Sequence, residues 1–340
     1  MNTMRLGKTN LMVGSSGFGA LPIQRLSKQE SVRLLCKARE SGMTFFDTAR
    51  MYSDSEEKIG EAFSGDRQAV VIATKTLATT RAGVTADLAV SLANLKTDYV
   101  DILQLHNPAT LPDPLDINGP YAALLEARKK GMVRFFGISN HSLEKAVAAA
   151  QSGLYDTVQF PLSSLSSDKD LTIVTACMEA DAGLIAMKAL SGGLVTNAAT
   201  TFAFLRQYPT VLPIWGIQRE SELDEFLRME EEPPLLDTRM WELIAKDRQE
   251  LGGRFCRGCG YCMPCPAGIQ INWAARMSLL LRRAPYQGFL TDEWNATMGR
   301  IRDCTECGNC RSKCPYGLDT PELLRMNLDD YERFRDEHRA

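Results

Sequence analysis

The sequence has no excess of basic residues, because 39 lysines and arginines stand against 42 aspartates and glutamates, a net charge of −3. A surface that binds nucleic acid or anionic lipid usually carries such an excess, so we expect neither partner. No apolar run reaches the roughly 18 residues of a membrane span. The N-terminus also lacks the apolar segment of a signal peptide. In a 340-residue chain that is 44% hydrophobic and 24% charged, these absences predict a cytoplasmic globular protein.

Cysteine is scarce through most of the chain and concentrated in one segment. Eight of the ten cysteines lie between Cys256 and Cys314. The other two, Cys36 and Cys177, stand alone in apolar helical patterns and are expected to be buried. A cytosolic chain is not expected to carry four disulfides. The eight clustered cysteines are therefore predicted to be metal ligands.

Short apolar runs alternate with segments of helical period over residues 1 to about 230. Strands that are apolar along their whole length indicate a parallel sheet covered on both faces, and eight βα units predict a (β/α)₈ TIM barrel. A doubly wound open sheet is the alternative, but no G-x-G-x-x-G motif follows an early strand. The predicted strands are 13–18, 44–47, 69–75, 100–106, 133–139, 157–160, 184–190 and 211–215, and the predicted helices are 28–41, 85–96, 121–130, 142–152, 171–180, 200–208 and 221–229.

An acidic, proline-rich stretch at 229–234 ends the predicted barrel, because a helix cannot continue through consecutive prolines. We therefore expect a barrel domain in 1–235 and a second domain in 236–340. The second domain has helical patterns at 239–251, ended by Gly252 and Gly253, and at 273–283, with no strand pattern. A small all-α domain with a thin apolar core follows, so bound metal is expected to help specify its fold.

Four polar side chains lie at the ends of successive predicted strands. Asp47 and Tyr52 follow the second strand, Lys75 ends the third, and His106 ends the fourth. Catalytic groups of a parallel barrel lie at the carboxyl ends of its strands, so these four are expected to meet. A lysine beside a tyrosine lowers the pKa of the phenol, the carboxylate keeps the lysine charged, and a neutral histidine can donate a hydrogen bond. The set predicts a general acid aimed at a carbonyl oxygen during hydride transfer.

The segment FDTA at 46–49, together with Tyr52, Lys75 and His106, resembles the aldo-keto reductase superfamily over residues 3 to about 228. The resemblance implies a (β/α)₈ barrel, NAD(H) or NADP(H), and interconversion of an aldehyde or ketone and an alcohol. It also implies that Ser139, Asn140 and Gln159 hold the nicotinamide carboxamide. The loop at 190–194, with Ser191, Gly192, Gly193 and Leu194, is similar to the family's pyrophosphate loop, where glycines let the backbone approach phosphates.

Two positions depart from the family pattern. Met187 stands where many members place an aromatic ring against the nicotinamide. Gly216 and Glu222 stand where many place basic residues beside the adenosine 2′-phosphate. An acid there suits a free ribose hydroxyl and favours NADH, although Gln218 and Arg219 can still bind a phosphate. All five residues are retained as implied cofactor contacts.

The clustered cysteines form two motifs. The second, Cys304, Cys307, Cys310 and Cys314 followed by proline, fits the C-x₂-C-x₂-C-x₃-C-P run of ferredoxins. The first, Cys256, Cys259, Cys262 and Cys265 followed by proline, is one residue shorter. The spacing predicts two [4Fe–4S] clusters, with zinc or a single cluster as the alternative. The helical spacer resembles the alpha-helical ferredoxin family. Because the cysteine before proline is expected to turn away from its own triplet, Cys314 should join the first triplet and Cys265 the second.

The sequence thus predicts an oxidoreductase in which a reductase barrel is fused to a helical ferredoxin-type domain. A nucleotide-binding redox sensor and an electron-transfer protein that uses the barrel as a docking scaffold are alternatives, but the intact tetrad favours an enzyme. Hydride transfer moves two electrons whereas a cluster passes one, and no flavin motif is present. The clusters are therefore expected either to be structural or to relay single electrons, and their number favours a relay. The expected partners are a small carbonyl or alcohol substrate and a redox protein. Arg254, Arg257, Arg311 and Lys313 flank the motifs and are either docking residues for an acidic partner or simply solvated.

Overall fold

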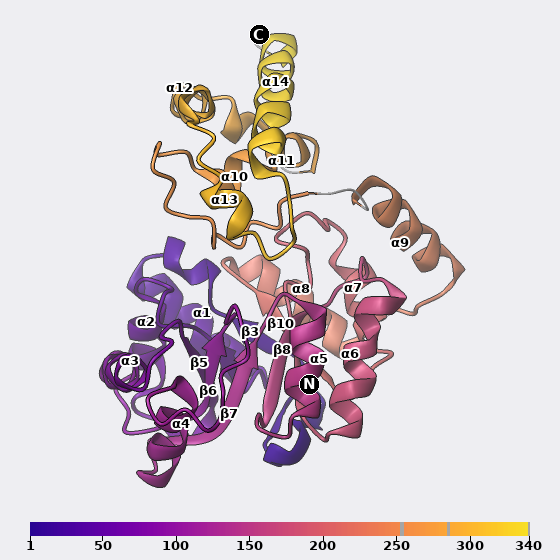
Figure 1. Cartoon of the computed structure of the whole chain (residues 1–340). Helices are drawn as coiled ribbons and strands as arrows, with labels where there is room; N and C mark the ends of the chain where they lie inside the picture. Colours follow the sequence, from indigo (N-terminus) through magenta and orange to yellow (C-terminus); the bar gives the residue numbers. More distant parts are fainter. Residues whose placement is uncertain (252–254, 284–285, 339–340) are drawn as a thin grey trace. The chain divides into compact units, whose positions relative to one another are not determined.

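The computed structural model describes residues 1–251, 255–283 and 286–338, which divide into two compact units (Figure 1). The barrel unit contains Met1–Ala189 and Ala199–Asp237, and the cysteine unit contains Leu190–Ala198 and the chain from Thr238 onward. The segment Leu190–Ala198, which the sequence prediction assigned to the barrel domain, therefore belongs to the other unit. The predicted helix stop at Gly252 and Gly253, and the basic Arg254, lie outside the described residues.

Eight parallel strands close the barrel in the order β10-β3-β4-β5-β6-β7-β8-β9, and a helix follows each strand (Figure 1). Because β10 pairs with both β3 and β9, the barrel prediction is confirmed and the open sheet is excluded. The strands are β3 (Gly17–Gly19), β4 (Phe45–Asp47), β5 (Val71–Thr76), β6 (Val100–His106), β7 (Val133–Ser139), β8 (Thr157–Pro161), β9 (Gly183–Met187) and β10 (Val211–Gly216). The helices are α1 (Lys28–Glu40), α2 (Ser55–Phe63), α3 (Arg81–Asn94), α4 (Pro120–Lys129), α5 (Leu143–Gln151), α6 (Asp168–Glu179), α7 (Ala198–Leu205) and α8 (Glu220–Glu231).

Several elements differ from the sequence prediction, and three of these differences have a local cause. The run 13–18 is divided: β2 (Met12–Gly14) pairs antiparallel with β1 (Thr3–Arg5), and the barrel strand starts at Gly17. The break falls at Ser15 and Ser16, whose hydroxyls donate to the buried carboxylate of Glu230. Strand β9 ends three residues earlier than predicted, where Lys188 takes a left-handed φ of 54°. Helix α2 was absent from the prediction because its charged start and internal glycine weaken the helical pattern.

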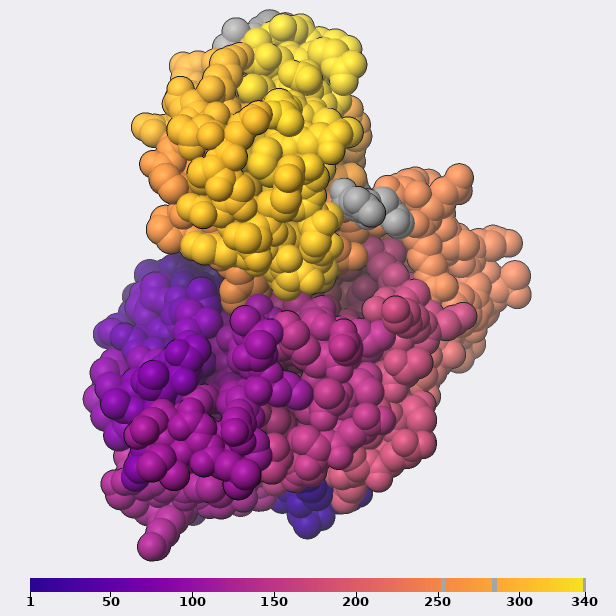
Figure 2. Space-filling view, in the orientation of Figure 1, coloured from indigo at the N-terminus to yellow at the C-terminus, as the bar shows by residue number. Residues whose placement is uncertain are grey.

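The cysteine unit is helical, and its described residues from Thr238 onward contain no strand. The longest helix, α14, contacts α10, α11, α12 and α13 and forms a large part of the yellow surface of this unit in Figure 2. Tyr331 of α14 is 1% exposed, and its hydroxyl donates to Phe289 O at 2.9 Å. No helix in the described ranges combines the length and the apolar character that crossing a bilayer requires. The helices are α9 (Thr238–Leu251), α10 (Ile271–Ala274), α11 (Met277–Arg283), α12 (Asp292–Gly299), α13 (Asn309–Ser312) and α14 (Thr320–His338).

Candidate active site and cysteine cavities

The four residues predicted to be catalytic lie at the carboxyl ends of three adjacent barrel strands. Asp47 and His106 are the last residues of β4 and β6, Lys75 is the penultimate residue of β5, and Tyr52 lies in the loop between β4 and α2. Strand β5 pairs with both β4 and β6. The structure therefore gathers these side chains at one end of the barrel.

Asp47 and Lys75 form a buried ion pair. Lys75 Nζ donates to Asp47 Oδ2 and to Thr48 O, both at 2.6 Å, and the two charged residues are 1% and 3% exposed. Burial raises the pKa of Asp47 and lowers that of Lys75, while the ion pair opposes both shifts. Asp47 also accepts from Gln104 Nε2 at 3.2 Å and from Gln159 Nε2 at 3.3 Å. The sequence reasoning missed Gln104, although a polar residue two positions before His106 lies on the same strand face.

Tyr52 and His106 lie beside this ion pair. Lys75 Nζ is 5.3 Å from the centroid of the Tyr52 ring. The Tyr52 and His106 rings are 6.0 Å apart and nearly perpendicular, at 82°. Burial, helped by the charges of Lys75 and Lys188, lowers the pKa of His106 to about 3. The imidazole is therefore neutral at pH 7 and can donate one N–H.

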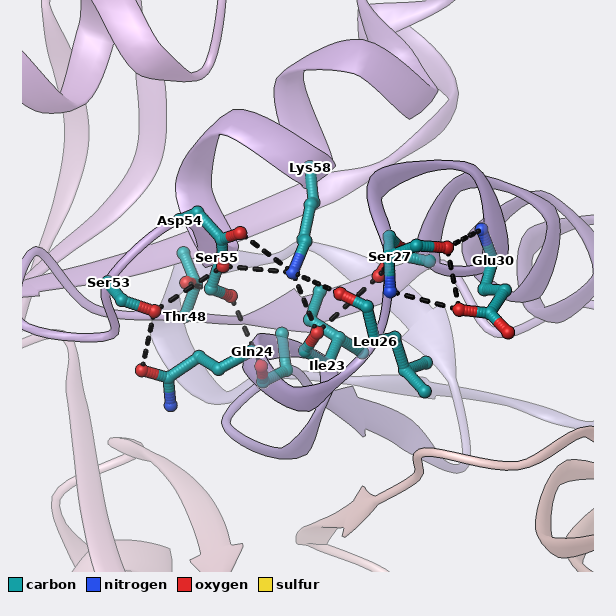
Figure 3. Close-up of polar contacts among 12 residues, drawn as sticks. Ile23, Gln24, Leu26, Ser27, Glu30, Thr48, Ser53, Asp54, Ser55 and Lys58 are labelled. Atoms are coloured by element: carbon teal, nitrogen blue, oxygen red, sulfur yellow. Dashed lines mark hydrogen bonds and ion pairs between the residues drawn. The ribbon is translucent and has the colours of Figure 1, made fainter.

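Hydrogen bonds at both of its ends fix the loop that carries Tyr52 (Figure 3). Thr48 Oγ1 and Ser55 Oγ share a hydrogen bond of 2.9 Å across the loop. Lys58, in the first turns of α2, is only 2% exposed and ties the loop to the segment before α1. A buried ammonium is stable only with several acceptors, so this lysine fixes the start of α2. Its acceptors are Ile23 O at 2.9 Å, Leu26 O at 2.8 Å and Asp54 Oδ1 at 2.9 Å.

The residues expected to hold the nicotinamide lie on the neighbouring strands. Ser139 ends β7 and pairs with Gln159 of β8, and both are 1% exposed. Gln159 Oε1 is a buried acceptor with no hydrogen-bond partner among the described residues, so it fits the amide N–H of a carboxamide. The Asn140 side chain instead holds loops, because it donates to Pro108 O at 3.1 Å and accepts from Ser142 N at 2.8 Å. Met187 ends β9 and packs against the barrel core.

The residues implied for the adenosine end surround the start of α8. Gly216 ends β10, and Gln218 Oε1 accepts from Arg25 Nη1 at 3.1 Å. Glu222 Oε2 accepts from the backbone N–H groups of Gln218 at 2.9 Å and of Arg219 at 3.1 Å. Its other oxygen pairs with Arg219 Nε at 3.0 Å. Glu222 thus caps its own helix, a local role that the family comparison alone did not indicate.

The glycine-rich loop after β9 lies in the cysteine unit, so the structure does not group it with the residues above. Ser191, Gly192 and Gly193 have positive φ values of 51°, 73° and 89°, and Leu194 is buried. A Cβ atom on Gly192 would lie 2.9 Å from Arg276 Nη1, whereas a Cβ atom on Gly193 would meet nothing within 4 Å. The first glycine therefore packs against Arg276 inside the cysteine unit, and the second faces open space.

The eight clustered cysteines line two cavities. Cys256, Cys259, Cys262 and Cys314 line the first cavity. Cys265, Cys304, Cys307 and Cys310 line the second, together with Cys262. No three His, Cys, Asp or Glu side chains of the described residues are placed to hold a single metal ion. Thiols spread around a cavity fit a larger group that contains several metal atoms. Burial raises the pKa of the Cys262 thiol to about 12, so ligation there would displace a proton.

Comparison with known proteins gives two family matches. Residues 10–207 match the aldo/keto reductase family, and residues 255–319 match a 4Fe-4S dicluster domain. An aldo-keto reductase of Strobilurus tenacellus is 29% identical over 219 residues, which cover 57% of this chain and 63% of that protein. A methylglyoxal reductase of Salmonella typhi is 34% identical over 147 residues, which cover 41% of this chain and 54% of that protein. Matches to the first curated relatives span between 49% and 63% of their length.

The fold is also that of solved structures. The structure of an aldo-keto reductase from Klebsiella pneumoniae in complex with NADPH superposes with a TM-score of 0.62 at 21% identity. The match covers 72% of this chain and 94% of that one. At this identity the likeness shows a shared fold.

Proposed function

Because the chain belongs to the aldo/keto reductase family, we propose that it interconverts an aldehyde or ketone and an alcohol with NAD(P)H. One observation carries the proposal: the buried Asp47–Lys75 pair lies beside Tyr52 and a neutral His106 at the barrel strand ends. A redox sensor or a docking scaffold has no use for a proton donor assembled in this way.

In the proposed reaction, a reduced nicotinamide held at Ser139 and Gln159 would supply the hydride that the carbonyl carbon accepts. His106 donates a hydrogen bond to the carbonyl oxygen and orients the substrate. Tyr52 gives its phenolic proton to the same oxygen as the C–O π bond becomes a lone pair, so that an alcohol forms. Lys75 stabilises the phenolate that remains, Asp47 holds Lys75 in place, and solvent returns the proton to Tyr52.

The proposed nucleotide contacts follow the family pattern. Gln159 Oε1 is the buried acceptor that suits the carboxamide, and Ser139 lies opposite it on the next strand. The open backbone at Gly193 suits a phosphate. Glu222 keeps a negative charge at the start of α8, which supports NADH at least as strongly as NADPH.

The test is anaerobic oxidation of NADH and NADPH with a panel of small aldehydes and ketones. Tyr52→Phe should lower turnover by about 10²- to 10⁴-fold, the usual effect of losing a general acid. Nucleotide affinity should change little, because the phenol hydroxyl acts on the substrate. Near-normal carbonyl reduction by this variant would refute the assignment of Tyr52 as the proton donor.

For the cysteine unit, we infer two [4Fe–4S] clusters that relay single electrons between a partner protein and the substrate or a flavin. Cys256, Cys259, Cys262 and Cys314 would hold one cluster, and Cys265, Cys304, Cys307 and Cys310 would hold the other. The two cavities share Cys262 and Ile271 as lining residues, so they are neighbours. Neighbouring clusters suit a relay, whereas one cluster would be enough to stabilise a small domain.

The relay is tested with Cys307→Ser, after iron and sulfide analysis and circular dichroism establish that one cluster is lost and the fold retained. Loss of partner-driven turnover alone would support the relay. Full NAD(P)H-dependent activity would exclude an essential role of that cluster in hydride chemistry. Global unfolding would instead support a structural role.

A further inference from the structure

A buried arginine connects the glycine-rich loop to the first cysteine motif, entirely within the cysteine unit. Arg276, between α10 and α11, is 8% exposed, and its Nη1 donates to Gly192 O at 2.8 Å. The same guanidinium lies over Gly258, where an added Cβ would be 2.9 Å from Arg276 Cζ and 3.0 Å from Nη1. Gly258 stands between Cys256 and Cys259, which both line the first cavity. One side chain thus contacts the proposed nucleotide loop and the proposed ligand loop together.

A second contact joins the same two loops through the backbone. A Cβ atom on Gly192 would lie 3.1 Å from Arg257 O, so the glycine-rich loop packs directly on the residue after Cys256. The Arg257 guanidinium stacks on Tyr316, with its Cζ 4.3 Å from the ring centroid. Tyr316 also lines the first cavity. The backbone of this motif therefore has little room to shift without moving Gly192.

We propose that Arg276 is a positioning residue through which occupancy of the first cysteine cavity controls nucleotide affinity. This inference rests on the proposed function, in which the loop at 190–194 receives the pyrophosphate. Filling the cavity fixes Cys256 and Cys259, and therefore Gly258 between them. The Arg276 guanidinium packs on Gly258, so it is held in place as well. It then holds the Gly192 carbonyl, to which it donates. With the cavity empty, Gly258 and Arg276 lose this constraint, and a nucleotide must order the loop itself.

Such a coupling is reciprocal, because two ligands that favour the same state must strengthen each other's binding equally. A bound nucleotide should therefore retain the metal group in the first cavity. Couplings of this kind typically amount to about 5- to 150-fold in affinity. The free energy of a buried hydrogen bond from a charged donor corresponds to a change in affinity within this range.

The first experiment measures the dissociation constants of NAD⁺ and NADP⁺ by anaerobic calorimetry on the full chain with both cavities filled. Arg276→Ala should weaken binding about tenfold while turnover at saturating nucleotide stays unchanged. Arg276→Lys, which retains one donor, should recover part of the loss. Arg282→Ala is the matched control: it removes another guanidinium six residues along, paired with Asp330, and should leave affinity unchanged.

A double-mutant cycle separates coupling from simple loss of a contact. Cys259→Ser, checked for iron loss, should weaken nucleotide binding by about the same factor as Arg276→Ala. The two changes together should weaken it no further, because both break one connection. Additive effects of the two substitutions would overturn the proposal.

A measurement on the unaltered protein covers the case in which Cys259→Ser does not fold. Iron release to a chelator is followed anaerobically with and without saturating NAD⁺ or NADP⁺. We expect nucleotide to slow one phase of release in the unaltered protein and to slow none in Arg276→Ala. Release that nucleotide leaves unchanged would refute the coupling while the proposed function stands. Failure of the filled protein to bind either nucleotide would refute the proposed function itself.

Discussion

In the barrel unit, apolar side chains fill the interior, whereas in the cysteine unit two of the enclosed spaces are lined by thiols. Phe45, Ile102, Ile185 and Leu212 are fully buried and belong to one apolar cluster. The two cysteine cavities are bounded by eight thiols together with apolar side chains such as Ile269, Ile271 and Leu324. Burying apolar surface stabilises a fold without any ligand, but thiols around a cavity contribute little until a metal group joins them.

One chain thus contains a unit that needs no ligand to stay folded and a unit that depends on its metal group. The barrel is expected to persist when metal is removed, and the cysteine unit is not.

The largest expected effect is that of removing the metal. Anaerobic chelation should release most of the protection of α10 to α14 in hydrogen–deuterium exchange, because structural metal sites contribute on the order of 10 kcal/mol to folding. Peptides from β4 to β8 should keep their protection. Equal loss of protection in both units would show that the barrel is not independent of the metal.

A matched pair of core substitutions compares the two units directly. Leu212→Ala in the barrel and Leu324→Ala in α14 each remove a side chain that is at most 1% exposed. The barrel change should cost about 2–5 kcal/mol with or without iron. The α14 change should lower the stability of the iron-loaded unit, but after chelation no cooperative unfolding of that unit should remain to be measured. Denaturant unfolding with and without chelator tests this, and a transition of the cysteine unit that survives chelation would contradict the contrast.

A pH effect is expected in the barrel unit. The pKa of His106 falls from an ordinary 6.5 to about 3 in the folded protein. Below pH 6.5 His106 is protonated in the unfolded chain but not in the folded barrel. The free energy of unfolding should therefore fall by up to about 1.4 kcal/mol per pH unit as the pH decreases toward 3. His106→Gln should flatten this part of the profile, as measured by barrel unfolding in urea. A profile that is unchanged in the variant would mean that His106 is not the group responsible.

The smallest effect concerns nucleotide choice. Glu222→Gln removes a negative charge and keeps an acceptor for the N–H groups at the start of α8. A partly exposed charge is screened, so we expect the preference to move toward NADPH by only about threefold in kcat/KM. Glu225→Gln, on the same helix, is a control for a general change in charge. A shift of equal size in both variants would remove Glu222 from the choice of cofactor.

The barrel was predictable because each of its strands is marked by a short run of consecutive apolar residues. The run at 100–106 matches β6 residue for residue, since seven consecutive buried positions leave no other element of that length. The polar ends of such strands then indicated Asp47, Lys75 and His106, because strand direction alone gathers them.

Other features depend on contacts that no local pattern records. Helix α2 needs Gly60 because an added Cβ would lie 2.2 Å from Asn94 O, so the residue that weakens the helical pattern is required by packing on α3. Gly192 was assigned to phosphate binding, yet its carbonyl accepts a hydrogen bond from Arg276, 84 residues away. The role of Glu222 at its own helix start is local, but it was not predicted, because the resemblance assigned this residue to the nucleotide.

The placement of Leu190–Ala198 makes this protein more than two modules in tandem. Its chain passes from one unit to the other three times, after Ala189, Ala198 and Asp237. Ordinary fused domains are joined by one linker and can be separated by one cut. Here a protein ended at Asp237 would keep the excursion at 190–198 and lose Arg257 and Arg276, which contact Gly192. The barrel can therefore be isolated, or exchanged for a relative's barrel, only if this excursion is redesigned as well. A substitution in the excursion must stay compatible with the cysteine unit.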